Sequence, residues 1–228
     1  MSILPINCQF ICEQFVSTEK TMADNFSELS DIESPVGKPT AEGPSLTYVR
    51  EVMPINQFHG VRQADDLDDL VELPMLGACK NCFAKGIKTV SSSANQGDVE
   101  RGGPAYFYID CDRLTPANRV LALQIGGKVH FDIYEISIFF DFALEEDTTI
   151  TAMEQASCAI VAQLTNQEPK DYPYTLEELQ KLFENYQKNL PADEVEREEF
   201  ERSIGTIFDS LEEYLELMDE REGFYYRP

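Results

Sequence analysis

The sequence predicts an α+β fold: a small antiparallel sheet at about 105–144, followed by three helices, with a disordered acidic arm in front. Apolar and polar residues alternate in the middle of the chain, apolar residues at helical spacing follow, and Pro and Gly interrupt the beginning. Strands bury alternate residues and helices bury every third or fourth, so these patterns separate sheet from helix. We expect a flexible arm over 1–60, a sheet-containing core with one helix over 61–165, and an acidic helical region over 166–228.

The arm contains two stretches rich in Pro and Gly, Ser34–Pro39 and Gly43–Ser45. Pro lacks a backbone N–H and Gly has the greatest backbone freedom, so helix and sheet do not propagate through such stretches. We expect a disordered or extended segment with one short strand at Leu46–Val52. The composition changes at Met22, so the alternatives of a start at Met1 or at Met22 both stay open.

The predicted sheet begins from a hairpin signal. Two β-prone runs, Val120–Ile125 and Lys128–Tyr134, flank a Gly-Gly pair. Glycine takes the positive φ angles of a type I′ turn without strain, so the pair predicts a tight turn. Around this hairpin we expect a strand at Ala105–Ile109, a continuation of the alternation over 136–144, and a polar loop over Ser91–Pro104.

Three helices are predicted after the sheet. Thr151 with Glu154 opens the first as a capping box, and Thr175 with Glu178 opens the second. Pro191 ends the second helix. The third carries apolar residues at alternating spacings of four and three, which is the a/d pattern of a coiled coil, and acids flank this pattern. The residues of this stripe are Phe200, Ile204, Ile207, Leu211, Tyr214 and Met218.

The charge of the chain excludes some classes of protein. Its 228 residues include 42 acids and 18 bases, a formal net charge of −24. Proteins that coat phosphate backbones or dock on anionic membranes do so through Lys and Arg, so we expect neither direct nucleic-acid binding nor membrane binding. Seventeen acids and six bases lie in residues 171–228 alone. This excess favours basic protein partners.

The cysteines indicate a reducing compartment. The first fifteen residues lack the basic start of a secretory signal, so we expect reduced thiols in a cytoplasmic or nuclear, intracellular protein. Cys79 and Cys82 form a C-x-x-C in an expected loop, which is half of a zinc site. Cys111, His59 and His130 stand at irregular separations from it. We therefore expect two ordinary loop residues and no cofactor, and keep zinc as an alternative.

The sequence contains no complete catalytic motif. His130, Asp132 and Tyr134 share one face of an expected strand and could form an acid–base cluster with Glu135 or Asp141. This composition is equally typical of a solvated strand face, which we prefer. Neither a G-x-S-x-G turn nor a glycine-rich phosphate loop occurs. We expect a protein that is not an enzyme.

Residues 65–76 interleave acids with apolar side chains. As a helix ending at Pro74, this segment would carry one apolar stripe surrounded by carboxylates, made by Leu67, Leu70, Val71 and Leu73. It resembles the acidic-hydrophobic activation segments of viral and cellular transcription activators. Such a stripe either packs on the core of its own chain or docks in a partner's groove.

These features predict a non-catalytic protein-interaction or structural protein, with a viral assembly protein as one form of it. It would contact partners through 65–76 and the stripe over 200–218. The stripe alternatively packs on its own chain, and if it joins two copies, its acids favour an antiparallel homo-oligomer. Two alternatives stay open: an acidic nucleic-acid mimic that binds a basic protein, and a small zinc-binding module centred on Cys79 and Cys82.

Overall fold

Four strands and seven α-helices make up the part of the chain that the structure, a computed structural model, describes: residues 43–46, 52, 61–101, 103–133, 135–204 and 206–219. A short 3₁₀ helix over Ala64–Asp69 precedes them. The elements are α1 (Leu73–Ala84), β1 (Thr89–Ser93), α2 (Gln96–Arg101), β2 (Ala105–Asp110), α3 (Pro116–Gln124), β3 (Lys128–Phe131), β4 (Ile136–Phe142), α4 (Ile150–Gln163), α5 (Leu176–Asn189), α6 (Glu194–Ile204) and α7 (Leu211–Asp219).

The strands form one antiparallel sheet in the order β1-β2-β4-β3. Phe107 pairs with Phe140 on one face, and the next residue, Tyr108, pairs with Phe139 on the opposite face. Side chains of β2 and β4 therefore alternate between the two faces, as two-residue periodicity requires, whereas the pairing register shifts between Thr89 and Ser91 of β1. The predicted α+β class is confirmed, and the expected strands at Lys128–Tyr134 and over 136–144 are present as β3 and β4.

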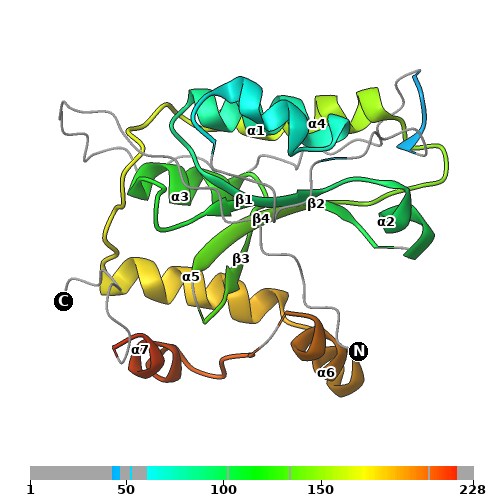
Figure 1. Ribbon diagram of the computed structural model, residues 1–228. Coiled ribbons are helices and arrows are strands. Elements are labelled where there is room, and N and C mark those ends of the chain that lie inside the picture. Colours follow the sequence, from blue (N-terminus) through cyan, green and yellow to red (C-terminus); the bar gives the residue numbers. More distant parts are fainter. Residues whose placement is uncertain are drawn as a thin grey trace.

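Helices α1 and α4 cover one face of the sheet and lie side by side above it (Figure 1). Gly77 lets them approach closely, because a Cβ there would lie 2.9 Å from the Sγ of Cys158. Below them, Phe107 stacks on Phe140 with ring centroids 5.1 Å apart. Met75 is completely buried in this layer. The packing is apolar and dense, which makes this the main hydrophobic core.

Helix α5 runs beside the edge strand β3, with α6 and α7 beyond it (Figure 1). Its buried residues fall at helical spacing, and the backbone N–H of Val129 donates to the Oδ1 of Asn185 at 2.8 Å. Phe131 reaches from β3 into an aromatic cluster, with its ring centroid 4.7 Å from that of Tyr214. One hydrophobic cluster extends from Leu46 to Met218, so both sides of the expected boundary at 165 share a core.

The predicted hairpin over Val120–Ile125 is wrong, because this run belongs to helix α3. Thr115 caps that helix by accepting from the N–H of Asn118, and Pro116 follows at its start. Gly126, at φ +97°, then ends it: the Gly127 N–H donates to the Ala122 carbonyl at 2.8 Å. Together with the Gly126 N–H, which donates to Leu123, this is a Schellman cap. The Gly-Gly pair therefore terminates a helix and does not join two strands.

The expected single helix over 200–218 is also wrong, because α6 ends at Ile204 and α7 begins at Leu211. The heptad pattern thus runs across two helices and the segment between them. The capping box of α5 and the end of that helix before Pro191 are confirmed. Helix α4 begins two residues earlier than expected, since Thr149 and not Thr151 caps it. Residues 61–165 hold α1 to α4 where one helix was expected.

The expected polar loop over Ser91–Pro104 instead contributes to strand β1 and contains helix α2. Strand β1 lies at the sheet edge, where half-exposed Ser residues are compatible with backbone pairing to β2. Most of the expected arm lies outside the described residues, as does most of the expected strand at Leu46–Val52. Among the helices that the structure describes, none has the length and apolar composition needed to cross a bilayer.

Candidate functional site

The expected partner-binding segment over 65–76 lies against the protein's own core. Leu67 and Val71 are each 2% exposed, and Leu70 packs partly against the same cluster. The side chain of Leu73 is more exposed than these, at 37%. The segment forms the 3₁₀ helix and the start of α1, and Pro74 stands in the first turn of that helix instead of ending one. In the structure, the apolar stripe of this segment thus packs on its own chain, which is one of the two alternatives that the sequence left open.

The stripe residues of the C-terminal helices also face their own chain. Tyr214 and Met218 are buried, and Phe208, which the heptad pattern did not include, is buried with them. The ring of Phe208 lies edge-on to Tyr214, 5.0 Å between centroids. The other described stripe side chains are partly buried: Phe200, Ile207 and Leu211; the side chain of Ile204 lies outside the described set.

Cys79 and Cys82 lie in helix α1, not in a loop, and both are fully buried. Burial raises the pKa of the Cys79 thiol to about 11 and that of Cys82 well above its ordinary value. Across the described parts of the chain, no group of three or more His, Cys, Asp or Glu side chains could hold a metal ion.

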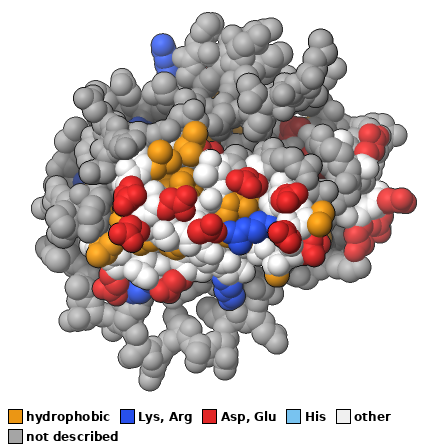
Figure 2. Space-filling view, turned by 90° about the horizontal axis from the view of Figure 1, so that it is seen from below, with side chains coloured by type: hydrophobic (Ala, Val, Ile, Leu, Met, Phe, Trp, Pro, Cys, Tyr) orange, Lys and Arg blue, Asp and Glu red, His pale blue; other side chains and the backbone are white. Residues whose placement is uncertain are grey.

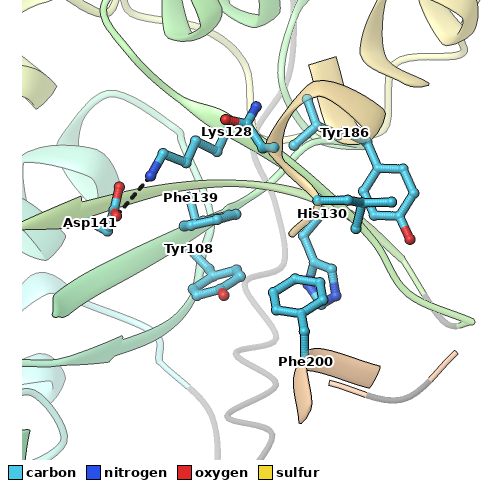
Figure 3. A pocket seen from close by; sticks show the side chains of 10 residues that line it. Tyr108, Lys128, His130, Phe139, Asp141, Tyr186 and Phe200 are labelled. Atoms are coloured by element: carbon cyan, nitrogen blue, oxygen red, sulfur yellow. Dashed lines mark hydrogen bonds and ion pairs between the residues drawn. The ribbon is translucent and has the colours of Figure 1, made fainter. Parts of the chain in front are cut away.

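A pocket of about 220 Å³ opens on the face of the sheet opposite to α1, beside α5 and α6 (Figure 3). We call it the aromatic pocket. Strands β2, β3 and β4 provide its floor through the alternate residues that point to this face, and Val129 of the edge strand β3 also lines it. The end of α5 and the middle of α6 provide its walls. Its lining residues are Tyr108, Lys128, Val129, His130, Phe139, Asp141, Tyr186, Asn189, Leu190 and Phe200.

His130 is one of the polar residues that line this pocket. Its Nε2 atom is buried and makes no hydrogen bond. Burial lowers the pKa of the imidazole, and the charge of Asp132 opposes this shift only in part. The ring is therefore neutral near pH 7. The expected solvated strand face is wrong at His130, because the Nε2 of this residue of β3 is buried beside α5 and α6.

An ion pair closes one side of the pocket. Lys128 Nζ lies 2.8 Å from Asp141 Oδ2 and 5.9 Å from the centroid of the Phe139 ring (Figure 3). Tyr108 stacks on Phe139 at 5.0 Å and stands edge-on to His130 at 6.0 Å. Burial, with the charge of Asp141 as a smaller cause, raises the pKa of Tyr108, so its hydroxyl stays protonated. The floor thus presents neutral rings, with its one cation already paired.

The wall is fixed by the packing of α5 on the segment before α7. The hydroxyl of Tyr186 accepts a hydrogen bond from the backbone N–H of Phe208 at 3.2 Å, so this polar atom is engaged while the ring lines the pocket. Asn189 and Leu190 follow one turn later, and Phe200 comes from α6. Chemically, this arrangement can hold one apolar or aromatic group, and the Nε2 of His130 beside it is covered and unpaired.

Acidic side chains surround the pocket side of the molecule. Figure 2 shows Asp and Glu spread over this side, with smaller apolar areas between them. We call α5, α6, α7 and the residues between them the acidic layer. Of its bases, Lys181 pairs with Glu177 at 2.7 Å and Arg197 with Asp209 at 2.5 Å. The exposed acids of this layer are Glu177, Glu184, Asp193, Glu194, Glu196, Glu198, Glu201, Asp209, Glu212, Glu213 and Glu216.

A second group of buried titratable residues lies where β2 ends. Lys88 pairs with Asp110 at 2.7 Å, and the hydroxyl of Tyr174 donates to Asp112 at 2.5 Å. Burial and then the charge of Asp110 raise the pKa of Asp112 to about 6 and that of Glu135 to about 7. These contacts connect the sheet to the segment that leads into α5. We interpret the group as a structural junction.

Sequence reasoning found His130 and Asp141 but not the aromatic residues around them. The sequence pattern identifies Tyr108 and Phe139 only as strand residues, although each occupies the alternate position that faces away from the core. Phe200 was assigned to a stripe. Comparison with protein-family models, with curated proteins and with solved structures finds no match, so the pocket and the acidic layer are the basis for a functional proposal.

Proposed function

We propose that this chain is a non-catalytic protein-interaction module that binds a basic protein segment on its acidic layer, with the aromatic pocket as the anchor point. The single observation that carries the proposal is the buried, unpaired Nε2 of His130 in an aromatic pocket beside a dense set of exposed acids. Interfaces gain most of their affinity from a few anchors in desolvated pockets, and charge on the surrounding rim steers the partner.

The charge distribution supports a basic partner over a second copy of the chain. Two copies meeting through this side would bring Glu184, Glu201 and Glu216 of each toward similar acids of the other, which is unfavourable. A segment rich in Lys and Arg gains from the same field. Assembly through other surfaces stays compatible with this proposal.

The thiols support a reducing, intracellular setting for this interaction. In the described part of the chain, Cys79, Cys82, Cys111 and Cys158 are all free, and the first three are buried. Buried free thiols behave as small apolar groups and are compatible with cytoplasm or nucleus.

Affinity capture from the native source with quantitative mass spectrometry tests the proposal. The bait is the full chain, compared with a variant carrying Glu184→Lys, Glu201→Lys and Glu216→Lys in the acidic layer. We expect the triple variant to lose specific partners, and the loss to resemble the effect of raised salt.

The matched control carries Glu146→Lys, Asp147→Lys and Glu154→Lys, three exposed acids in and before α4, with the same change in net charge. It should keep the partners. Equal losses in both variants would mean that only net charge matters, and unchanged capture by the acidic-layer variant would contradict the proposal. Capture of nucleic-acid-binding proteins independently of the pocket would favour the nucleic-acid mimic instead.

A further inference from the structure

We infer that the aromatic pocket takes a tyrosine side chain from the basic partner segment, and that the His130 ring then turns so that its Nε2, which is covered in the unbound chain, hydrogen-bonds the phenolic hydroxyl. This inference rests on the proposed function and names the anchor residue that the pocket selects. The volume of the pocket, its unpaired polar atom and its ion pair each limit which side chain can occupy it.

The volume of the pocket suits one aromatic ring. A cavity of about 150 Å³ holds benzene, whereas sites for drug-sized ligands begin at about 300 Å³. The aromatic pocket, at about 220 Å³, lies between these values. It therefore has room for a single ring with a polar substituent, and is too small for most cofactors. The stacked pair of Tyr108 and Phe139 offers the ring faces and edges on which another ring packs well.

The unpaired Nε2 selects a hydroxyl. A buried polar atom without a partner is unfavourable, so an occupant that pairs with it is preferred over one that does not. In a neutral imidazole, Nε2 donates or accepts according to the tautomer. A phenolic hydroxyl can do either, while an indole N–H can only donate and a hydrocarbon can do neither. Tyrosine thus satisfies His130 in both tautomers, and phenylalanine in none.

The ion pair argues against a cationic occupant. Aromatic pockets bind ammonium groups when a ring face and a carboxylate stand free. Here Lys128 already lies over Phe139 and holds Asp141 at 2.8 Å. A lysine or methylated lysine in the pocket would meet the Lys128 charge. Basic residues of the partner are better placed beside the pocket, against exposed acids of α5 and α6 such as Glu184, Glu196 and Glu201.

Peptide binding to the full chain tests this inference. The probes are acetylated, amidated peptides Arg-Lys-X-Lys-Arg in which X is Tyr, Phe, Leu or trimethyl-lysine. We expect the Tyr peptide to bind at least about tenfold more tightly than the Phe peptide, as one repaired buried hydrogen bond allows. NMR supplies a direct readout: the chain has two histidines, so a His59→Gln variant assigns the imidazole signals of His130, which should shift with the Tyr peptide.

A His130→Phe variant completes the test. It keeps a ring in the pocket but removes the nitrogen, so the Tyr and Phe peptides should bind equally. If wild type binds all four peptides alike, with salt-sensitive affinity and no shift at His130, the tyrosine inference is overturned and the acidic-layer proposal stands. Preference for trimethyl-lysine would overturn the inference in the same way. If no peptide binds at low ionic strength, the result counts against both.

Discussion

The two helical layers of this protein use different side chains to cover one sheet. Helices α1 and α4 approach closely at Gly77 and bury thiols and apolar side chains. The acidic layer has an interior of aromatic rings, centred on Phe131 and Tyr214, and an exterior of carboxylates. Close packing of small residues leaves little to offer a partner. Large rings around an incompletely filled pocket leave space for one further side chain, which is where we propose that a partner binds.

The largest difference in stability is expected between substitutions at two neighbouring residues of β2 that face opposite sides of the sheet. Phe107 is fully buried between the sheet and the upper helices, so Phe107→Ala should lower the free energy of unfolding by about 3–5 kcal/mol. Tyr108 is half-buried at the pocket, so Tyr108→Ala should lower the free energy of unfolding by only about 1–2 kcal/mol. Urea unfolding measures both.

The milder Phe107→Leu keeps the comparison usable if Phe107→Ala does not fold, with an expected loss of about 1.5 kcal/mol. This loss of unfolding free energy should still exceed the loss caused by Tyr108→Leu. Equal losses at the two positions would show that the pocket side carries as much stability as the core. In that case the two layers would not be specialised as we argue.

The junction between the layers should give a pH effect of intermediate size. Folding raises the pKa of Asp112 from 3.8 to about 6 and that of Glu135 from 4.5 to about 7, mainly through burial. A raised carboxyl pKa means that the folded state favours the protonated form. This contribution to stability is complete below about pH 4 and is lost as the pH rises through about 7.

Glu135→Gln isolates this contribution. Relative to wild type, the variant should gain about 2 kcal/mol near pH 8 and nothing near pH 4. Urea titrations at several pH values measure the difference, and Glu146→Gln, at an exposed position, is the control that should show no such trend. A gain that is equal at both pH values would mean that the charge of Glu135 is not the cause.

Much of the fold could be predicted because its signals are local. The capping box of α5 at Thr175 and the strand at Ala105–Ile109 require only neighbouring residues. Helix α3 was mistaken for a strand because Val120–Ile125 is β-prone, although Thr115-Pro116 before it and Gly126 after it are helix-capping signals. The capping residues at the two ends of α3 thus indicate a helix more clearly than the residues inside it do.

The aromatic pocket could not be predicted, because its residues are distant in sequence. Tyr108, Phe139 and Phe200 meet only through strand register and through the break that separates α6 from α7. The heptad spacing suggested one continuous helix and hid this break. His130 was recognisable as a polar residue on a strand, but whether that face is solvated depends on α5, which the local pattern does not position.

A smaller effect on stability is expected at the N-terminal caps of one helix in each layer. Thr149 caps α4 and Thr175 caps α5, each by accepting from a backbone N–H at 3.2 Å. Replacing either by Ala should lower the free energy of unfolding by about 1 kcal/mol. Hydrogen exchange should then differ by location: Thr175→Ala should speed exchange in α5, and Thr149→Ala in α4. Faster exchange throughout both layers for either variant would show that they unfold as one unit.

The smallest stability effect is expected at the rim of the aromatic pocket, where Lys128 and Asp141 are each about one-third exposed. Because such pairs contribute little, Lys128→Met should cost about 0.5 kcal/mol in urea unfolding. Its effect on selectivity should be larger. Without the Lys128 charge, Phe139 and Asp141 can receive a cation, so the trimethyl-lysine peptide should bind severalfold more tightly than to wild type while the Tyr peptide changes little. Unchanged trimethyl-lysine binding would show that Lys128 does not exclude cations from the pocket.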